Sequence, residues 1–533
     1  MQAEVLLRGG TVVTQDRRQP RAQALAVAGG RVVALSAGAA DLDELIGPST
    51  RVIDLAGAAV VPGFVDAHVH FGHWALARQQ VDLDAAATLE QGLALVRKAA
   101  GGLPPGAWVQ GRGWDRNRWG RLPTRGELDV AVGGRAAALS SHDGHSLWLS
   151  SAALQTAGIA RGTPDVAGGV IERDAQSEPT GVLFENAQDL VRSAIPEPSD
   201  AELLSALRGG LHRAAAAGLT GIHNLEDART RRAFAALEAS GELSLRVYHG
   251  VSRGELHEAR ERGLATGSGS DWLRIGPVKL FADGALGSRT AWLLEPYAGH
   301  VEEGYRGVAT LSAEDLDHAM CQAGDAGLDV AVHAIGDAAV RGVLDAFERT
   351  CATHPPLAQR LLRIEHAQLV HPDDVARFAR LGVIASMQPI HAVADWHVAD
   401  QYWGDRARYG YAWRAMLDAG ARLAFGTDAP VESIEPLHSL YAAVARRDAA
   451  GEPRAGWYAE QCLSLEEAVR AYTQGSAAAE RAAARRGALA AGMDADLVVL
   501  APDPFERPIE ALQEVSIALT MVGGRITFEG ALR

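Results

Sequence analysis

The chain has 533 residues, of which 47% are hydrophobic, and its formal net charge is −15 at pH 7. This composition supports a large folded core and excludes a disordered chain. The acidic balance argues against nucleic acid or an anionic membrane as a partner, because basic side chains must neutralise phosphate. We therefore expect a small-molecule substrate, which one local arginine could still bind if it were anionic.

Three cysteines, Cys321, Cys351 and Cys462, are scattered and lack CxxC spacing. They are typical of reduced thiols in a cytoplasmic protein. Residues 1–10 lack the basic and apolar regions of a signal peptide, and no apolar run approaches the ~20 residues of a membrane span. The sequence thus predicts a cytoplasmic location.

Both ends of the chain contain short strand-like runs that are broken by glycine pairs. Gly9-Gly10 and Gly29-Gly30 separate such runs near the start, and Gly523-Gly524 lies between two of them near the end. Because neither end alone has many strands, we predict one composite β-sandwich from residues 1–60 and 485–533. Two unrelated β caps are the alternative.

The middle of the chain alternates strand-like runs with alanine-rich amphipathic helices, which is typical of a (β/α)8 TIM-type barrel of the α/β class. Strand one is expected within residues 61–81 and the other seven within 191–484. The candidate strands are 64–70, 220–226, 243–250, 274–284, 329–337, 362–368, 383–389 and 423–430. The gap between the first two is far too long for one connection, so we predict an inserted α/β subdomain at 82–190.

The first candidate strand ends in His68-Val69-His70. Because side chains alternate along a strand, Phe64, Asp66, His68 and His70 share one face. Two imidazoles on one face of a strand end can bind one metal ion. A His-x-His pair alone is weak evidence, so the hypothesis depends on ligands from elsewhere in the chain.

Further ionisable residues lie near the ends of four other candidate strands: Lys279, His333, His366 and Asp428. Alternation points Lys279, His333 and Asp428 into the barrel, where unpaired ionisable groups cost several kcal/mol. Taken singly, each has an ordinary structural interpretation, such as a core histidine or a turn aspartate. Their joint occurrence at strand ends favours a metal centre. In strand six, alternation places Arg363 and Glu365 outward, as a surface pair.

The chain resembles the amidohydrolase superfamily over nearly its whole length, in particular the family 3 branch that includes N-substituted formamide deformylases. The motifs that carry the resemblance lie at residues 62–70, 113–115, 143–145, 279–290, 333–337, 365–367, 426–430 and 495–500. They are specific for the family and poorly specific for the substrate.

The resemblance implies one or two divalent cations, zinc above all, in a binuclear centre with six ligands: His68, His70, Lys279, His333, His366 and Asp428. The pair His333 and His366 would hold the second cation, and Lys279 would bridge both as an N-carboxylated lysine. Burial lowers the pKa of a lysine, which favours the neutral amine that carbon dioxide converts to a carbamate. The same donors also accept Fe, Mn or Co.

The resemblance further implies hydrolysis of a non-peptide C–N bond, in an amide, formamide or cyclic amide, by metal-activated water. Asp428 would take the proton of the attacking water and pass it to the leaving nitrogen. Six side chains are candidates for orienting the substrate: Trp114, Asp115, Asp143, His145, Arg289 and Gln388. Turns and surface pairs are equally good interpretations of Asp143, His145, Arg289 and Gln388, and buried core is the more common role of a tryptophan such as Trp114.

Two alternatives stay open. A mononuclear deaminase on the same barrel typically has a Glu beyond the strand-five histidine, whereas this stretch ends in Asp337 and strand four carries Lys279. A catalytically inactive barrel that acts as a binding or assembly protein is the other, since a fold alone does not settle function. A homo-oligomer is compatible with the sequence.

Overall fold

The computed structural model describes residues 2–84, 86–141, 146–166, 169–287, 289–299 and 304–531. The chain forms two compact units, Met1–Gly72 with Leu207–Arg533, and His73–Ala206. The predicted insertion at 82–190 lies within the second unit. Among the described residues, none of the helices combines the length and apolar character needed to cross a bilayer. The three cysteines are free thiols.

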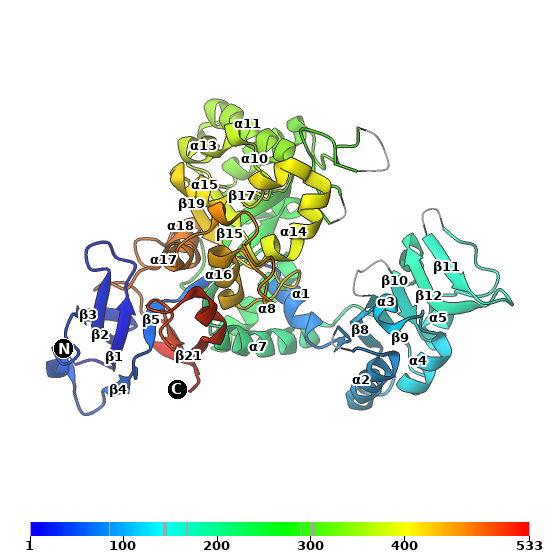
Figure 1. Cartoon of the computed structure of the whole chain (residues 1–533), viewed down its shortest axis with the longest axis horizontal. Coiled ribbons are helices and arrows are strands. Elements are labelled where there is room, and N and C mark those ends of the chain that lie inside the picture. Colours follow the sequence, from blue (N-terminus) through cyan, green and yellow to red (C-terminus); the bar gives the residue numbers. More distant parts are fainter. Residues whose placement is uncertain are drawn as a thin grey trace. The chain divides into compact units, whose positions relative to one another are not determined.

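The larger unit is built on one sheet of eight parallel strands. In sheet order they are β6 (Phe64–Val69), β13 (Leu219–Asn224), β14 (Arg246–Ser252), β15 (Leu273–Phe281), β16 (Val330–Ala334), β17 (Leu362–His366), β18 (Ile384–Met387) and β19 (Arg422–Phe425). Each candidate strand overlaps one of these. Figure 1 shows helices around β15, β17 and β19, including α10 (Ala313–Asp325), α11 (Asp337–Thr353), α13 (Pro372–Leu381) and α15 (Trp413–Asp418). The predicted (β/α)8 barrel is confirmed.

The first and last strands meet just beyond their carboxyl ends. The Asp428 N–H donates to the His68 carbonyl at 2.7 Å, and the His70 N–H donates to the Ala429 carbonyl at 2.9 Å. These bonds bring the two segments that carry predicted metal ligands side by side. The barrel closure itself therefore places His68, His70 and Asp428 together.

The helices around the barrel begin and end at recognisable signals. In α13, Pro372 occupies the first turn, where its missing N–H costs nothing, and Gly382 ends the helix at a φ of +67°. In α10, the Ser312 side chain accepts a hydrogen bond from the Asp315 N–H. Such caps fix the short connections that hold each strand end in place.

Strands from both chain ends form a second eight-stranded sheet, drawn mainly in blue and red in Figure 1. Its members are β1 (Val5–Val13), β2 (Arg21–Ala28), β3 (Arg31–Ser36), β4 (Arg51–Asp54), β5 (Ala59–Pro62), β20 (Leu497–Ala501), β21 (Ser516–Val522) and β22 (Arg525–Glu529). The antiparallel pairing of Val60 with Val499 joins the two ends. One hydrophobic core takes Leu25 from one end and Met521 from the other. The two ends are thus one structural element, and only Gly63 separates β5 from the barrel strand β6.

The inserted unit has its own six-stranded sheet and its own hydrophobic cores. The strands, in sheet order, are β11 (Gly169–Arg173), β12 (Pro179–Glu185), β10 (Ser146–Leu149), β9 (Ala137–Ser141), β8 (Val109–Trp114) and β7 (Val81–Asp82). Helices α2 (Leu89–Gly102) and α4 (Arg125–Val132) pack with Trp114 and Trp148 in one core. The unit is therefore a mixed α/β fold.

Candidate metal centre

Asp428 and the two histidines of the His-x-His pair form a compact cluster at the carboxyl end of the barrel. Asp428 Oδ1 lies 3.5 Å from His68 Nε2 and 3.4 Å from His70 Nε2. Two ligands of a tetrahedral Zn²⁺ at about 2.0–2.2 Å are themselves about 3.3–3.5 Å apart. The three side chains therefore fit one metal ion with little rearrangement.

The backbone around Asp428 is fixed by a buried carboxylate. Asp66 Oδ1 accepts hydrogen bonds from the His68 and Thr427 N–H groups, both at 3.0 Å. Asp428 itself has a φ of +60°, a conformation that a non-glycine residue adopts only when its surroundings impose it. Burial raises the pKa of Asp66 to about 7. This carboxyl group ties β6 to the loop after β19 and so aims Asp428 at the histidines.

Gly426 makes this approach of the two segments possible. A Cβ at this position would lie 2.5 Å from the His68 backbone nitrogen and 2.7 Å from Asp66 Oδ1. Only glycine therefore lets the loop after β19 lie directly against β6.

Lys279 points into the barrel, as strand alternation predicts. It lies on β15 and is 5% exposed, and its Nζ is 3.4 Å from His68 Nε2. Burial lowers the pKa of this amine to about 8. A lowered pKa increases the fraction of neutral amine, which is the form that carbon dioxide converts to a carbamate.

His333 and His366 lie next to each other, with ring centroids 4.5 Å apart. His333 Nε2 donates to the Gly284 carbonyl at 2.9 Å, and His366 Nδ1 donates to Gln388 Oε1 at 2.8 Å. Each bond fixes a tautomer that leaves a lone pair on the other ring nitrogen. Burial lowers the pKa of His333 to about 3 and that of His366 well below its usual range. Both rings are thus neutral, the form that binds metals.

The prediction that Arg363 and Glu365 face outward is wrong. Both are fully buried; Glu365 Oε2 accepts from His68 Nδ1 at 2.6 Å, and Arg363 Nε donates to Glu365 Oε1 at 2.5 Å. The reason is the backbone at the end of β17, where His366 and Ala367 have φ of +72° and +43°. These left-handed residues break the alternation, so Glu365 and His366 both face the centre. Glu365 thereby orients His68 as an outer carboxylate.

Sequence reasoning missed His391, on the first turn of α14 (Pro389–Trp403). Its Nε2 lies 3.8 Å from Asp428 Oδ2, and His366, His391 and Asp428 form a second group that could hold a metal ion. The available signal is the segment Gln388-Pro389-Ile390-His391, where the proline starts a helix directly after β18.

Four of the predicted substrate residues belong to the inserted unit, and the structure describes two of them. In the inserted unit, Trp114 is 1% exposed and its Nε1 donates to the Leu139 carbonyl at 2.7 Å, while the Asp115 carbonyl accepts from the Trp119 N–H. Asp143 and His145 lie outside the described residues. Their role in substrate binding stays a prediction.

Two more of these candidates belong to the barrel unit. Gln388 is 1% exposed and holds the His366 ring, so it lies at the metal centre. Arg289 has a φ of +59°, and its guanidinium is 5.4 Å from the centroid of the Tyr402 ring. Contact of either with a substrate stays a prediction.

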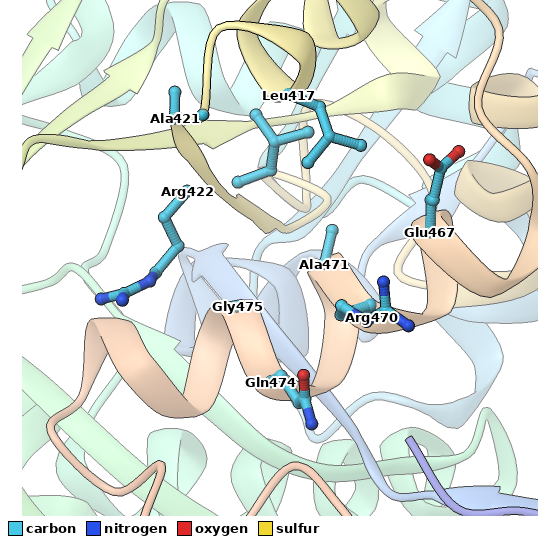
Figure 2. A pocket seen from close by; sticks show the side chains of 10 residues that line it. Leu417, Ala421, Arg422, Glu467, Arg470, Ala471, Gln474 and Gly475 are labelled. Atoms are coloured by element: carbon cyan, nitrogen blue, oxygen red, sulfur yellow. The ribbon is translucent and has the colours of Figure 1, made fainter. Parts of the chain in front are cut away.

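A separate pocket of about 240 Å³ opens at the other end of the barrel. Figure 2 shows Arg422, the first residue of β19, among the residues that line this pocket, together with Arg470 and Gln474. Gln474 Nε2 donates to the Gln15 carbonyl, so this pocket adjoins the terminal sheet. Since Asp428 follows the opposite end of β19, this pocket is distinct from the metal centre, and barrel enzymes place their chemistry at the carboxyl end.

Comparison with known proteins identifies relatives along the whole chain. The amidohydrolase family model matches residues 51–528. The chain is 35% identical to the putative amidohydrolase YtcJ of Bacillus subtilis, covering 98% of each protein. It is 30% identical to N-substituted formamide deformylase of Arthrobacter pascens, covering 99% of this chain and 98% of that protein.

Among solved structures, an uncharacterized metal-dependent hydrolase from Pyrococcus furiosus is similar, with a TM-score of 0.77 and 30% identity. The match covers 94% of this chain and 99% of the archaeal one. These likenesses support a hydrolase. Since the family model and full-length relatives both match, the chain belongs to the amidohydrolase family.

Proposed function

We propose that this protein is a metal-dependent amidohydrolase that cleaves a non-peptide C–N bond of an amide, formamide or cyclic amide. The observation that carries the proposal is the cluster of His68, His70 and Asp428 at the carboxyl end of the barrel. The full-length likeness to a formamide deformylase supports this bond type. The three free cysteines support a cytoplasmic location.

The donor set fits a pair of divalent cations, and zinc suits its imidazoles and carboxylate. In this proposal, His68, His70 and Asp428 would hold one cation and the neutral imidazoles of His333 and His366 would hold the other. Lys279, as a carbamate, would supply a further carboxylate ligand. When bound, the cations lower the pKa of water and polarise a carbonyl group.

Asp428 is the proposed proton carrier. A water oxygen forms a bond to the substrate carbonyl carbon while its proton passes to an Asp428 oxygen. The C–N bond then breaks, and the nitrogen receives that proton and leaves as the amine, with a carboxylic acid as the other product. Glu365 and Asp66 keep His68 and Asp428 in position during both steps.

The test is a metal count combined with an assay on purified protein. We expect about two equivalents of metal per chain and amine release from a panel of N-alkyl formamides, acetamides and cyclic amides. The His68→Ala variant should lose both metal and turnover, whereas His257→Ala, at a histidine side chain that is 86% exposed, should keep both. A single metal with ammonia as the product would instead identify a deaminase. Full metal loading without turnover of any amide or amine would favour a binding protein.

A further inference from the structure

His391 lies at the metal centre, yet the proposed mechanism gives it no task. The residue is 6% exposed, and its ring stacks on that of His366 with centroids 6.2 Å apart and planes at 15°. It reaches the centre from α14, which follows β18. Of the strands β15 to β19, β18 is the one that contributes no proposed ligand. Such a buried polar ring requires a partner or a function.

A hydrogen bond holds the ring in one orientation. The Nε2 amide of the buried Gln368 is 3.1 Å from His391 Nδ1, so Nδ1 accepts and the neutral ring carries its proton on Nε2. That Nε2 has no hydrogen-bond partner among the residues that the structure describes. A buried donor without an acceptor costs about 1–3 kcal/mol, which a bound molecule can repay by supplying one.

The Asp428 oxygen that faces this donor is too distant to accept its hydrogen bond. Asp428 Oδ2 is 3.8 Å from His391 Nε2, beyond the usual limit for an N–H···O hydrogen bond. A substrate atom beside this pair would lie within reach of the imidazole while its neighbour on the same carbon lies within reach of Asp428. The geometry thus pairs one proton carrier with one hydrogen-bond donor.

We propose that His391 is a catalytic residue whose Nε2–H donates a hydrogen bond to the substrate carbonyl oxygen. This inference rests on the proposed amide hydrolysis and goes one step beyond it. As water oxygen bonds to the carbonyl carbon, the electron pair of the C=O π bond moves to that oxygen, which becomes negatively charged. His391 keeps its proton and stabilises this oxyanion. When the C–N bond breaks, the electron pair returns and the nitrogen takes the proton from Asp428.

A competing role is that of a metal ligand, because His366, His391 and Asp428 also form a possible metal group. That role requires the reverse arrangement, in which the Gln368 amide presents its oxygen to Nδ1 and Nε2 keeps a lone pair. Removal of the ring distinguishes the two roles. A variant without a metal ligand loses metal, whereas a variant without a hydrogen-bond donor keeps it.

The experiment compares His391→Ala and His391→Gln with the wild type in three measurements. A preorganised oxyanion donor is worth about 10²–10³-fold in kcat, so we expect that loss in His391→Ala with KM and metal content unchanged. The glutamine amide can place an N–H near the position of Nε2 and should restore part of kcat. A phosphonamidate with a tetrahedral oxyanion should bind His391→Ala at least about 10-fold more weakly by calorimetry, whereas formate, which is planar, should bind equally.

Two results would overturn the inference. Loss of a metal equivalent in His391→Ala would identify a ligand, and unchanged kcat and phosphonamidate affinity would leave the ring without a catalytic role. If the wild type hydrolyses no amide, the proposed function fails, but the phosphonamidate comparison still decides whether His391 recognises a tetrahedral oxyanion. Should His391→Ala not fold, the His391→Phe variant, which keeps a ring and donates no hydrogen bond, provides the same comparison.

Discussion

The buried carboxylates at the amino end of the barrel and Asp428 at its carboxyl end have opposite kinds of partners. At the amino end, Arg246 Nε lies 2.7 Å from Asp496 Oδ2, and Arg486 Nε lies 3.0 Å from Asp494 Oδ2. Permanent guanidinium cations there balance carboxylates within the chain. At the carboxyl end, the ion-pair partners of Asp428 among the described residues are histidines, whose rings burial keeps neutral in at least two cases.

This difference indicates which end of the barrel binds a metal ion. A guanidinium–carboxylate pair is complete as it stands. Asp428 is surrounded by imidazole rings and by a lysine of lowered pKa. These groups have electron pairs to share, and a divalent cation would bind them. The amino end therefore stabilises the fold, and the carboxyl end is arranged for chemistry.

Removal of the Asp428 carboxylate at the carboxyl end should have the largest effect on turnover. The Asp428→Asn variant keeps the shape of the side chain and loses its charge and its ability to take a proton. We expect kcat to fall by about 10²–10⁴-fold, the contribution of a positioned general base, with a melting temperature close to that of the wild type. A variant that turns over amides at the wild-type rate would show that Asp428 is not the proton carrier.

Replacing Lys279 tests the bridge between the two cations. The Lys279→Ala variant should retain one metal equivalent instead of two, because the carbamate is gone, and its turnover should fall with the metal. Acetate or propionate added with the metal should restore part of both, since a free carboxylate can occupy the vacated space. Lys98→Ala, at an exposed lysine of the inserted unit, is the control. Two metals in Lys279→Ala without added carboxylate would argue against a carbamate.

At the amino end the expected effect is on stability and not on turnover. Asp496→Ala leaves the buried Arg246 guanidinium without its two closest hydrogen bonds, 2.7 and 3.0 Å long, which should cost about 3–5 kcal/mol in the free energy of unfolding. Metal content and kcat should stay unchanged below the melting temperature. Glu258→Ala, which removes an exposed pair with Arg262, should cost at most about 1 kcal/mol. Loss of metal from folded Asp496→Ala would contradict the division between the two ends.

The smallest expected effect on the metal centre concerns the carboxylate behind His68. Glu365→Gln can still accept the His68 hydrogen bond but no longer balances Arg363. Removal of an outer carboxylate typically weakens metal binding about 10–100-fold, which a competition titration with a chromogenic chelator would detect. Equal affinity in variant and wild type would show that Glu365 serves only the buried ion pair.

The sequence predicted well wherever the backbone is regular. Alternation put His68 and His70 on one face of β6 and pointed Lys279 of β15 into the barrel, and strand order then brought these residues together. It failed at Glu365, because two left-handed residues follow it and no periodicity reveals them. The sequence did not predict His391 as a site residue, because it lies on a helix and comes close to Asp428 only in the closed barrel. The terminal sheet was predictable in outline, since both ends share the same glycine-broken strands, whereas the exact pairing of β5 with β20 required the structure.

A crystal structure of the metal-loaded protein, with anomalous scattering recorded at the zinc edge, tests the central claim most directly. We expect two anomalous peaks at the carboxyl end of the barrel, one among His68, His70 and Asp428 and one beside His333 and His366, with carbamate density on Lys279. Metal bound only elsewhere, or an empty carboxyl end in protein that hydrolyses amides, would contradict it.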